Sequence, residues 1–232
     1  MNLVQVLERL HELSNPEKVA FKAKKFGIST ENSLGIYHKD LKLLAEEIGM
    51  DTKLGTKLFD TVIYEARILC SKICKPTAIT KDMLDSWVVC FDTWEICDSF
   101  CMGLFKYNKH VIDKAFEWSL REEEFVKSAG LVLMAVYGFA DKKVDNTIFE
   151  SFFPVLIREA DDDRVYVKKA VNWALRQIGK RNIDLREKSI EVAKVILRKE
   201  SKAAQWIAKN ALRELQGDKL NVLDYPRAMY RA

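Results

Sequence analysis

Residues that form turns are scarce in this sequence, which has nine glycines and four prolines among 232 residues. An all-β chain needs frequent turns, and these consume glycine and proline, so the composition disfavours a β-sandwich or a β-barrel. Hydrophobic residues make up 48% and charged residues 31% of the chain, as is typical of globular proteins. The composition therefore predicts a folded, all-α protein with enough length to bury a core.

Long apolar runs are also missing, because no stretch approaches the ~18 to 20 residues of a membrane span. The N-terminal stretch MNLVQVLERLHEL is amphipathic and contains Glu8 and Glu12, so it does not resemble a signal peptide. An odd number of cysteines without a secretory signal indicates reduced thiols in an intracellular compartment. We therefore expect a soluble, cytoplasmic protein that does not bind a membrane.

Several common catalytic motifs are absent, including a Walker loop, G-x-G-x-x-G and G-x-S-x-G. Cys70 and Cys74, like Cys97 and Cys101, are spaced i, i+4, but their apolar neighbours favour small buried side chains over metal ligands. The three histidines are scattered, and none has a metal-ligand spacing to an acidic or cysteine cluster. We expect neither a metal nor an organic cofactor.

Apolar residues recur at i, i+3, i+4 and i+7 in nearly every segment, and this period predicts helices joined by short turns. Asn15, Thr80 and Asp184 are placed to cap helix starts. We expect one domain over residues 1–232, with an irregular tail at about 217–232. The expected helices are 2–13, 17–26, 37–49, 54–74 (broken once), 80–90, 92–105, 108–120, 122–138, 145–159, 164–179, 184–199 and 201–215.

Two faint internal similarities have a common spacing. Val126–Ala129 resembles Val167–Ala170, and Ala174–Arg176 resembles Ala211–Arg213, with offsets of 41 and 37 residues. HEAT-like helix pairs repeat at about 40 residues. The spacing therefore predicts an α-solenoid of antiparallel helix pairs with a concave groove. A single irregular helical domain without true repeats remains the alternative.

The segment DTWEICDSF (92–100) places a tryptophan and an aspartate together on one flank of a helix. At 100° per residue, Ile96, Cys97 and Phe100 form the core-facing stripe, while Trp94 and Asp98 lie at its border. Glu95 falls further round and is expected to face solvent. The pair therefore has the position of groove-lining residues, although a surface carboxylate in a local ion pair is the common alternative.

The segment DRVYVKKAVNWALRQIGK (163–180) shows a similar displacement. Trp173 lies outside the apolar arc of its helix, beside a group of cations: Lys168, Lys169, Arg176 and Lys180. A partly buried tryptophan covered by Lys and Arg stems would explain this pattern. An aromatic stacking surface flanked by phosphate contacts would explain it equally well and predicts a basic groove.

Together, these two helices suit a flat, cationic group carried on an anionic backbone. Aromatic faces attract cations, and a carboxylate can stabilise an oxocarbenium-like sugar. An N-alkylated purine in DNA has a positive base, a weakened glycosidic bond and flanking phosphates. The pattern therefore predicts a site for alkylated DNA.

Three segments resemble the AlkD-like family of HEAT-like DNA alkylation-repair proteins, which includes DNA glycosylases. They are Asp92–Asp98, Lys169–Arg176 and Ile63–Arg67, and the resemblance extends over roughly residues 20 to 215. It implies that Asp98 is catalytic and that Trp94 and Trp173 contact the damaged nucleotide. It further implies a DNA glycosylase that removes positively charged N3- or N7-alkylpurines from double-stranded DNA without a cofactor.

One position departs from the family pattern. Active members often have an arginine pair in the helix that corresponds to 122–138, whereas this chain has Lys127 and Ser128. Lysine can bind phosphate as a point charge but not in a bidentate manner. A noncatalytic HEAT-like module that binds unusual or damaged DNA is therefore an alternative, and a protein–protein scaffold is a third. In each case we expect a monomer.

Overall fold

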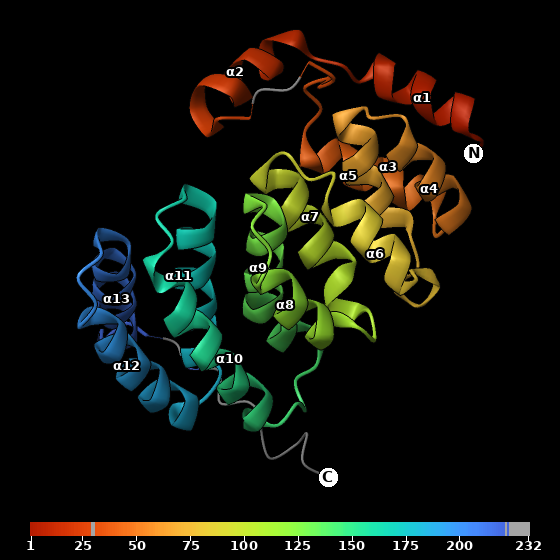
Figure 1. The fold of residues 1–232 in the computed structure, drawn as a ribbon. Helices are drawn as coiled ribbons and strands as arrows, with labels where there is room; N and C mark the ends of the chain where they lie inside the picture. The colour runs from red at the N-terminus through yellow and green to blue at the C-terminus, as the bar shows by residue number, and fades with distance from the viewer. Residues whose placement is uncertain (29–30, 221, 223–232) are drawn as a thin grey trace. The chain divides into compact units, whose positions relative to one another are not determined.

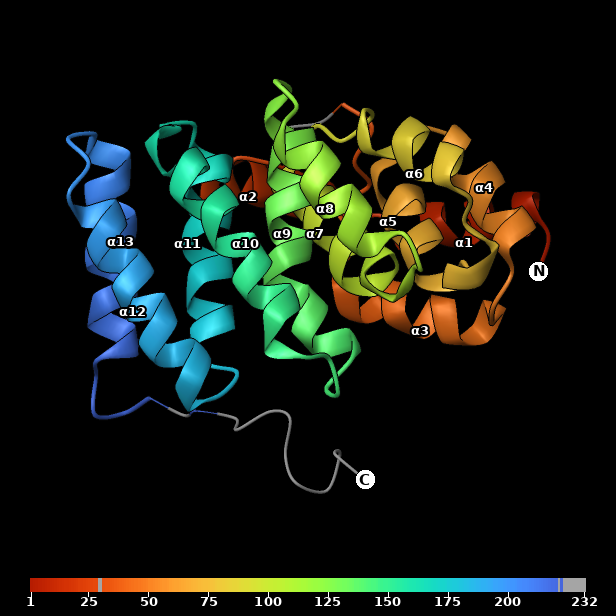
Figure 2. The same cartoon turned by 60° about the horizontal axis from the view of Figure 1, so that its bottom comes forward.

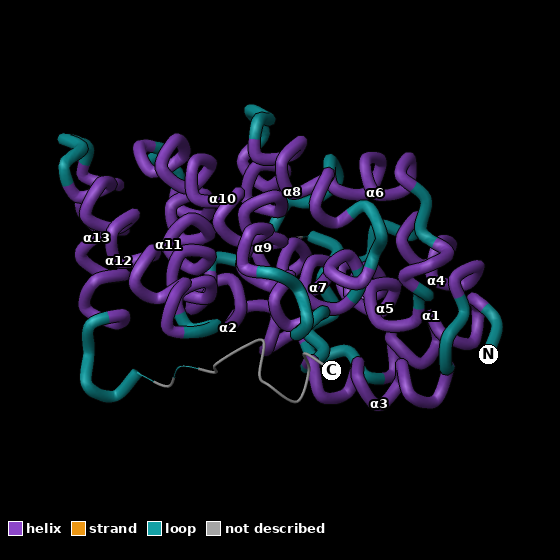
Figure 3. The backbone as a smooth tube through the Cα atoms, turned by 90° about the horizontal axis from the view of Figure 1, so that it is seen from below, coloured by secondary structure: helices purple, strands orange, loops and turns teal. Residues whose placement is uncertain are grey.

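The computed structural model describes residues 1–28, 31–220 and 222. Over this part of the chain the regular structure is helical, with thirteen α-helices, three short 3₁₀ helices and no strand (Figure 3). The chain divides into two compact units, an N-terminal unit (Met1–Asn108) and a C-terminal unit (Lys109–Ala232). The all-α prediction is confirmed, while one domain over 1–232 stays a prediction.

The N-terminal unit is built around α5, whose residues are nearly all buried and which packs against α3, α4 and α7 (Figure 1). The predicted break in 54–74 falls between α4 and α5, where Val62 adopts a φ of 54°. The α-helices of this unit are α1 (Leu3–Glu12), α2 (Pro16–Phe26), α3 (His38–Ile48), α4 (Thr52–Asp60), α5 (Tyr64–Ile73), α6 (Lys81–Val88) and α7 (Trp94–Gly103).

The C-terminal unit consists of helix pairs in two layers. Helices α9, α11 and α13 pack on one another in sequence, while α8, α10 and α12 form the second layer (Figure 2). This arrangement is the layering of HEAT-like repeats. The bounds are α8 (Val111–Ser119), α9 (Glu124–Ala140), α10 (Asn146–Arg158), α11 (Val165–Gly179), α12 (Ile183–Leu197) and α13 (Lys202–Leu215).

Side-chain caps confirm two of the three predicted helix starts. The Asn15 side chain accepts a hydrogen bond from the Lys18 amide at 3.2 Å, and Thr80 caps α6 in the same way. The prediction for Asp184 is wrong, because the Asn182 side chain caps α12 by accepting from the Leu185 amide at 2.9 Å. Asp184 instead lies in the first turn of α12, where its negative charge interacts favourably with the helix dipole.

The predicted irregular tail lies largely outside the described residues, which end with 220 and 222. Within the part that the structure describes, every helix is too short or too polar to span a lipid bilayer.

Candidate functional site

Helix α7 positions Asp98, the predicted catalytic residue, and Trp94, a predicted contact to the damaged nucleotide. The Thr93 hydroxyl caps its start by accepting from the Ile96 amide at 3.3 Å, so α7 begins at Trp94. The apolar stripe of the helix is buried as predicted: Ile96, Cys97 and Phe100 are each no more than 1% exposed. Trp94 and Asp98 are half-buried and lie one turn apart at the border of this stripe.

The indole of Trp94 is held in place by helix α2. Its Nε1 donates a hydrogen bond to the backbone carbonyl of Phe26, the last residue of α2, at 3.1 Å. The Phe26 ring meets the indole edge-on, with ring centroids 6.4 Å apart. A tryptophan fixed at both its polar and its apolar edge presents a pre-oriented face, as a stacking wall requires.

Asp98 is a half-buried carboxylate without a hydrogen-bond or ion-pair partner among the described residues. Burial raises the pKa of this carboxyl from 3.8 to about 6, because the charged form loses hydration that nothing nearby replaces. Most structural carboxylates at such depth are paired. An unpaired one with a raised pKa is characteristic of functional sites.

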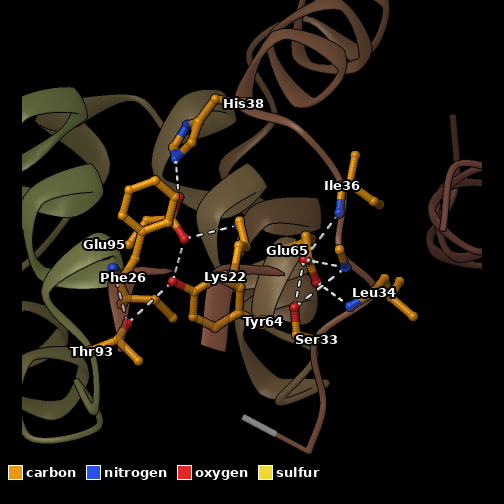
Figure 4. A network of polar contacts seen from close by, with 12 residues as sticks. Lys22, Phe26, Ser33, Leu34, Ile36, His38, Tyr64, Glu65, Thr93 and Glu95 are labelled. Atoms are coloured by element: carbon orange, nitrogen blue, oxygen red, sulfur yellow. Dashed lines mark hydrogen bonds and ion pairs between the residues drawn. The ribbon is translucent and has the colours of Figure 1, made fainter. Parts of the chain in front are cut away.

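Glu95, the residue between the two, does not face solvent as the helical wheel predicts. It is 7% exposed and accepts hydrogen bonds from three side chains (Figure 4). The donors are Tyr64 Oη at 2.6 Å, His38 Nε2 at 2.8 Å and Lys22 Nζ at 3.0 Å. These donors belong to α5, α3 and α2, so Glu95 joins α7 to three other helices of the N-terminal unit.

The same network sets the charge of Glu95. Burial alone would raise the pKa of its carboxyl, but the hydrogen bonds from His38, Tyr64 and Lys22 outweigh burial and lower it to about 2. Glu95 is therefore ionised at any physiological pH, whereas Asp98, about one turn away, ionises only as pH rises through about 6. The 3.6-residue helical period alone could not predict that Glu95 is buried, because its hydrogen-bond donors lie 31 to 73 positions away in the sequence.

Helix α11 in the C-terminal unit carries the second predicted tryptophan. Its core face is buried as predicted, and Trp173 is half-buried beside it. With the Gln177 amide oriented so that its oxygen faces both donors, that oxygen accepts from Trp173 Nε1 at 3.0 Å and from Lys180 Nζ at 3.2 Å. This indole, like that of Trp94, is fixed by a hydrogen bond within its own unit.

The predicted DNA-binding cations on α11 differ in how far their charge is already compensated. Arg176 and Lys180 both form ion pairs with Glu214, the latter at 2.8 Å. Lys169 is exposed, with its Nζ 5.7 Å from the Tyr166 ring centroid, and Lys168 lies 5.6 Å from that of Trp206. The two lysines therefore keep a charge without a carboxylate partner among the described residues.

Trp206 is a candidate that the sequence analysis missed. It lies on α13 and is 39% exposed, with Lys168 over its ring. The 3.6-residue period of α13 could not predict this exposure, since a helical wheel does not show whether another element covers the face that carries Trp206. The contact between Lys168 and Trp206 extends the aromatic and basic surface of α11 onto α13.

Lys127 has a position that the phosphate-binding prediction did not anticipate. It is 8% exposed, and its Nζ lies 2.7 Å from Glu159 Oε2 and 3.8 Å from Asp162 Oδ2. A lysine paired with two carboxylates in this way holds α9 against the turn that precedes α11. This geometry argues against a direct phosphate contact by Lys127.

The predicted site residues thus fall into two sets, with Trp94 and Asp98 in the N-terminal unit and Trp173 with its cations in the C-terminal unit. That both sets line one basic groove stays a prediction. Among the residues that the structure describes, no three His, Cys, Asp or Glu side chains lie close enough to hold a metal ion.

The fold and the tryptophan–aspartate pair define a class of protein, an all-α protein of stacked helix pairs with a candidate site on α7. Comparison with known proteins identifies the family. The family model for DNA alkylation repair enzymes matches residues 6–215, so the chain belongs to this family. No match was found among the curated proteins.

A solved structure supports the same fold. It is described as representing a new family of proteins related to the HEAT-like repeat DNA glycosylases with affinity for branched DNA structures. The two chains share 19% sequence identity with a TM-score of 0.76, and the match covers 92% of this chain and 95% of the other. The predicted HEAT-like fold is therefore confirmed.

Proposed function

We propose that this protein is a DNA glycosylase that hydrolyses the N-glycosidic bond of positively charged N3- or N7-alkylpurines in double-stranded DNA. The observation that carries the proposal is Asp98, an unpaired, half-buried carboxylate one turn from a fixed tryptophan. Family membership and the affinity of the solved relative for branched DNA support DNA as the partner.

The chemistry needs little beyond that carboxylate. When the glycosidic bond breaks, its electron pair neutralises the positive charge of the alkylated purine, so the base leaves without a general acid. Positive charge then develops on the deoxyribose, where the Asp98 carboxylate stabilises it electrostatically. Water adds to C1′, and its proton passes to Asp98 or to solvent. The Trp94 face attracts the cationic base before the bond breaks.

The test is the release of 7-methylguanine from methylated DNA by the unmodified protein and by Asp98→Asn. We expect release well above spontaneous depurination for the former and a loss of about 100-fold or more for the latter, as for removal of a preorganised electrostatic group. Asp92→Asn is the matched control, because Asp92 is an exposed aspartate just before α7. No release by the unmodified protein would refute the enzyme proposal, and equal release by Asp98→Asn would remove Asp98 from its role.

A second function is favoured by one observation. Lys127 is bound to Glu159, so the position where active members of the family often carry a phosphate-gripping arginine offers no free cation. Without that contact, the chain would bind DNA through Trp94, Trp173 and the α11 lysines but would not excise bases. This noncatalytic alternative predicts DNA binding that is equally strong for the unmodified protein and for Asp98→Asn, with no base release by either.

A further inference from the structure

Helix α2 lies on the surface of the N-terminal unit with none of its residues buried. An amphipathic helix normally buries its apolar face against the core. Here Phe21 and Phe26 remain 45% and 43% exposed. Core burial therefore does not explain why α2 keeps its place or why it carries two phenylalanines.

The start of α2 is fixed by a buried carboxylate. Glu65 is fully buried and accepts hydrogen bonds from the backbone amides of residues 34–36 at 2.7 to 3.3 Å and from the Ser33 hydroxyl (Figure 4). The loop held in this way accepts a hydrogen bond at the Leu34 carbonyl from the Asn15 amide at 2.7 Å. Asn15 is the residue that caps α2.

The middle and the end of α2 are tied to the candidate catalytic helix. Lys22, in the middle, forms its ion pair with Glu95, and the Phe26 carbonyl, at the end, accepts from Trp94 Nε1. Three polar attachments therefore hold α2 along its length. They orient its outer face without covering it.

Lys18, Phe21, Lys25 and Phe26 on that outer face form an aromatic–lysine row together with Tyr37, the residue just before α3. Lys18 Nζ lies 5.0 Å from the Tyr37 ring centroid and 5.5 Å from that of Phe21. Lys25 Nζ lies 5.1 Å from the Phe21 ring centroid and 5.5 Å from that of Phe26. The Phe26 ring in turn contacts Trp94, so the row ends at the candidate site.

We propose that the aromatic–lysine row binds a single-stranded stretch of DNA next to the site. Exposed rings stack on base faces of any sequence, and interleaved lysines contact the phosphates between them. In an intact duplex the base faces are already stacked and hidden, so only the lysines could engage it. The proposal rests on the proposed function in that it takes DNA as the partner, and it names single-stranded or branched DNA as the preferred form.

The charge of α2 favours nucleic acid over a neutral partner. The helix carries Lys18, Lys22, Lys24 and Lys25 against the single acidic residue Glu17. With Lys22 compensated by Glu95, the other three lysines of α2 have no carboxylate partner among the described residues, and two of them, Lys18 and Lys25, lie over the exposed rings. A basic helix with exposed phenylalanines can also lie on an anionic membrane. The experiment below therefore distinguishes DNA from a membrane as the partner of this surface.

The test measures the affinity of the full chain for fluorescein-labelled, undamaged DNA by anisotropy. One probe is a blunt duplex, and the other is the same duplex with a single-stranded extension. We expect the unmodified protein to prefer the extended probe. The double variant Phe21→Ala/Phe26→Ala removes two rings, and each ring–base stack contributes about 1 kcal/mol or more. It should therefore bind the extended probe about 30-fold more weakly or worse, and should bind the blunt duplex unchanged.

Matched controls exist in the same unit. Leu43→Ala removes an exposed apolar side chain from α3, and Lys24→Gln removes a lysine of α2 that contacts none of the rings; neither should change the preference. Lys25→Gln should weaken binding of the extended probe. Since all replaced side chains are exposed, thermal melts should show the variants to be folded.

An equal loss on both probes, or no loss on either, would overturn the proposal. So would binding to vesicles of phosphatidylserine without any preference for the extended probe. Because both probes are undamaged, failure to release 7-methylguanine would contradict the glycosylase and leave this result standing. Conversely, a lack of single-strand preference in the unmodified protein would contradict this inference and leave the proposed base release from duplex DNA untouched.

Discussion

At the scale of single residues, the two neighbouring acids of α7 have pKa values shifted in opposite directions. Glu95 is buried among three donors and has a lowered pKa, whereas Asp98 is half-buried without a partner among the described residues and has a raised one. Glu95 therefore stabilises the fold, while the ionised form of Asp98 destabilises it. Local destabilisation of this kind is common where a protein keeps a group ready for chemistry.

The raised pKa of Asp98 predicts how stability depends on pH. The folded chain holds this proton more tightly than the unfolded chain, so the free energy of unfolding falls as pH rises from 3.8 through about 6. Asp98→Asn removes that dependence. We expect the variant to match the unmodified protein at pH 4 and to be more stable by about 1–2 kcal/mol at pH 8, after allowance for screening by water.

Urea denaturation at the two pH values measures this difference. An Asp98→Asn variant that is less stable than the unmodified protein at pH 8 would show that the carboxylate has a stabilising partner. In the active enzyme the carboxylate must be ionised to stabilise positive charge, so the rate of base release should rise with pH through about 6.

Removal of the Glu95 charge should loosen the attachment of α2 to α7. Glu95→Gln keeps the shape of the side chain but leaves Lys22, whose side chain is only 12% exposed, without a counter-charge. We expect a loss of about 2–4 kcal/mol in the free energy of unfolding. The Trp94 fluorescence should also change, because the Phe26 carbonyl that holds its indole lies on the released helix. Glu46→Gln, at an exposed pair on α3, should do neither.

At the scale of secondary-structure elements, α8 and α9 cross at a glycine. A Cβ on Gly130 would lie 2.7 Å from the Ser119 amide nitrogen and 2.8 Å from the Ala115 carbonyl oxygen, both backbone atoms that cannot move aside. A Cβ on Gly138, also in α9, would meet only side-chain atoms at 3.2 Å or more. The first glycine therefore sets how closely the two helices approach.

Gly130→Ala should separate this helix pair. We expect a loss of roughly 2–3 kcal/mol in the free energy of unfolding, as for overpacking in a core. Gly138→Ala is the matched comparison and should destabilise the fold less, by about 1 kcal/mol, because its Cβ would lie 3.2 Å or more from the nearest atoms, which belong to side chains. Thermal or urea denaturation of both variants measures the difference, and equal effects would contradict the close crossing.

Most helices can be predicted from the sequence, since the 3.6-residue period is local. The same period locates the apolar stripes of α7 and α11. The period wrongly places Glu95 on the solvent side of α7. Its buried position is stabilised by hydrogen bonds from Lys22, His38 and Tyr64, which are close to it only in the folded chain. The period also cannot predict the ion pairs of Lys127, since Glu159 and Asp162 belong to a different part of the chain. A helical wheel locates a face but cannot show what lies against it.

At the scale of the whole molecule, the net charge of +4 is modest, so DNA binding depends on which cations are uncompensated. Lys169 has no carboxylate partner among the described residues, but Arg176 is paired with Glu214. We therefore expect Lys169→Ala to lower DNA affinity and to reduce the slope of log K against log salt by about one phosphate contact. Arg176→Ala should change the slope less, which a salt titration would measure. A larger change for Arg176→Ala would show that DNA displaces Glu214.

The placement of the thiols has a consequence for a member of the DNA alkylation repair family. Cys70, Cys74, Cys97 and Cys101 are buried, and burial raises the pKa of Cys70 and Cys101. Only the thiolate is a strong nucleophile, so these sulfurs are poor targets for electrophiles. Cys90, the exposed one, lies outside α7. The two thiols of the helix that carries Trp94 and Asp98 are thus poorly reactive toward alkylating electrophiles.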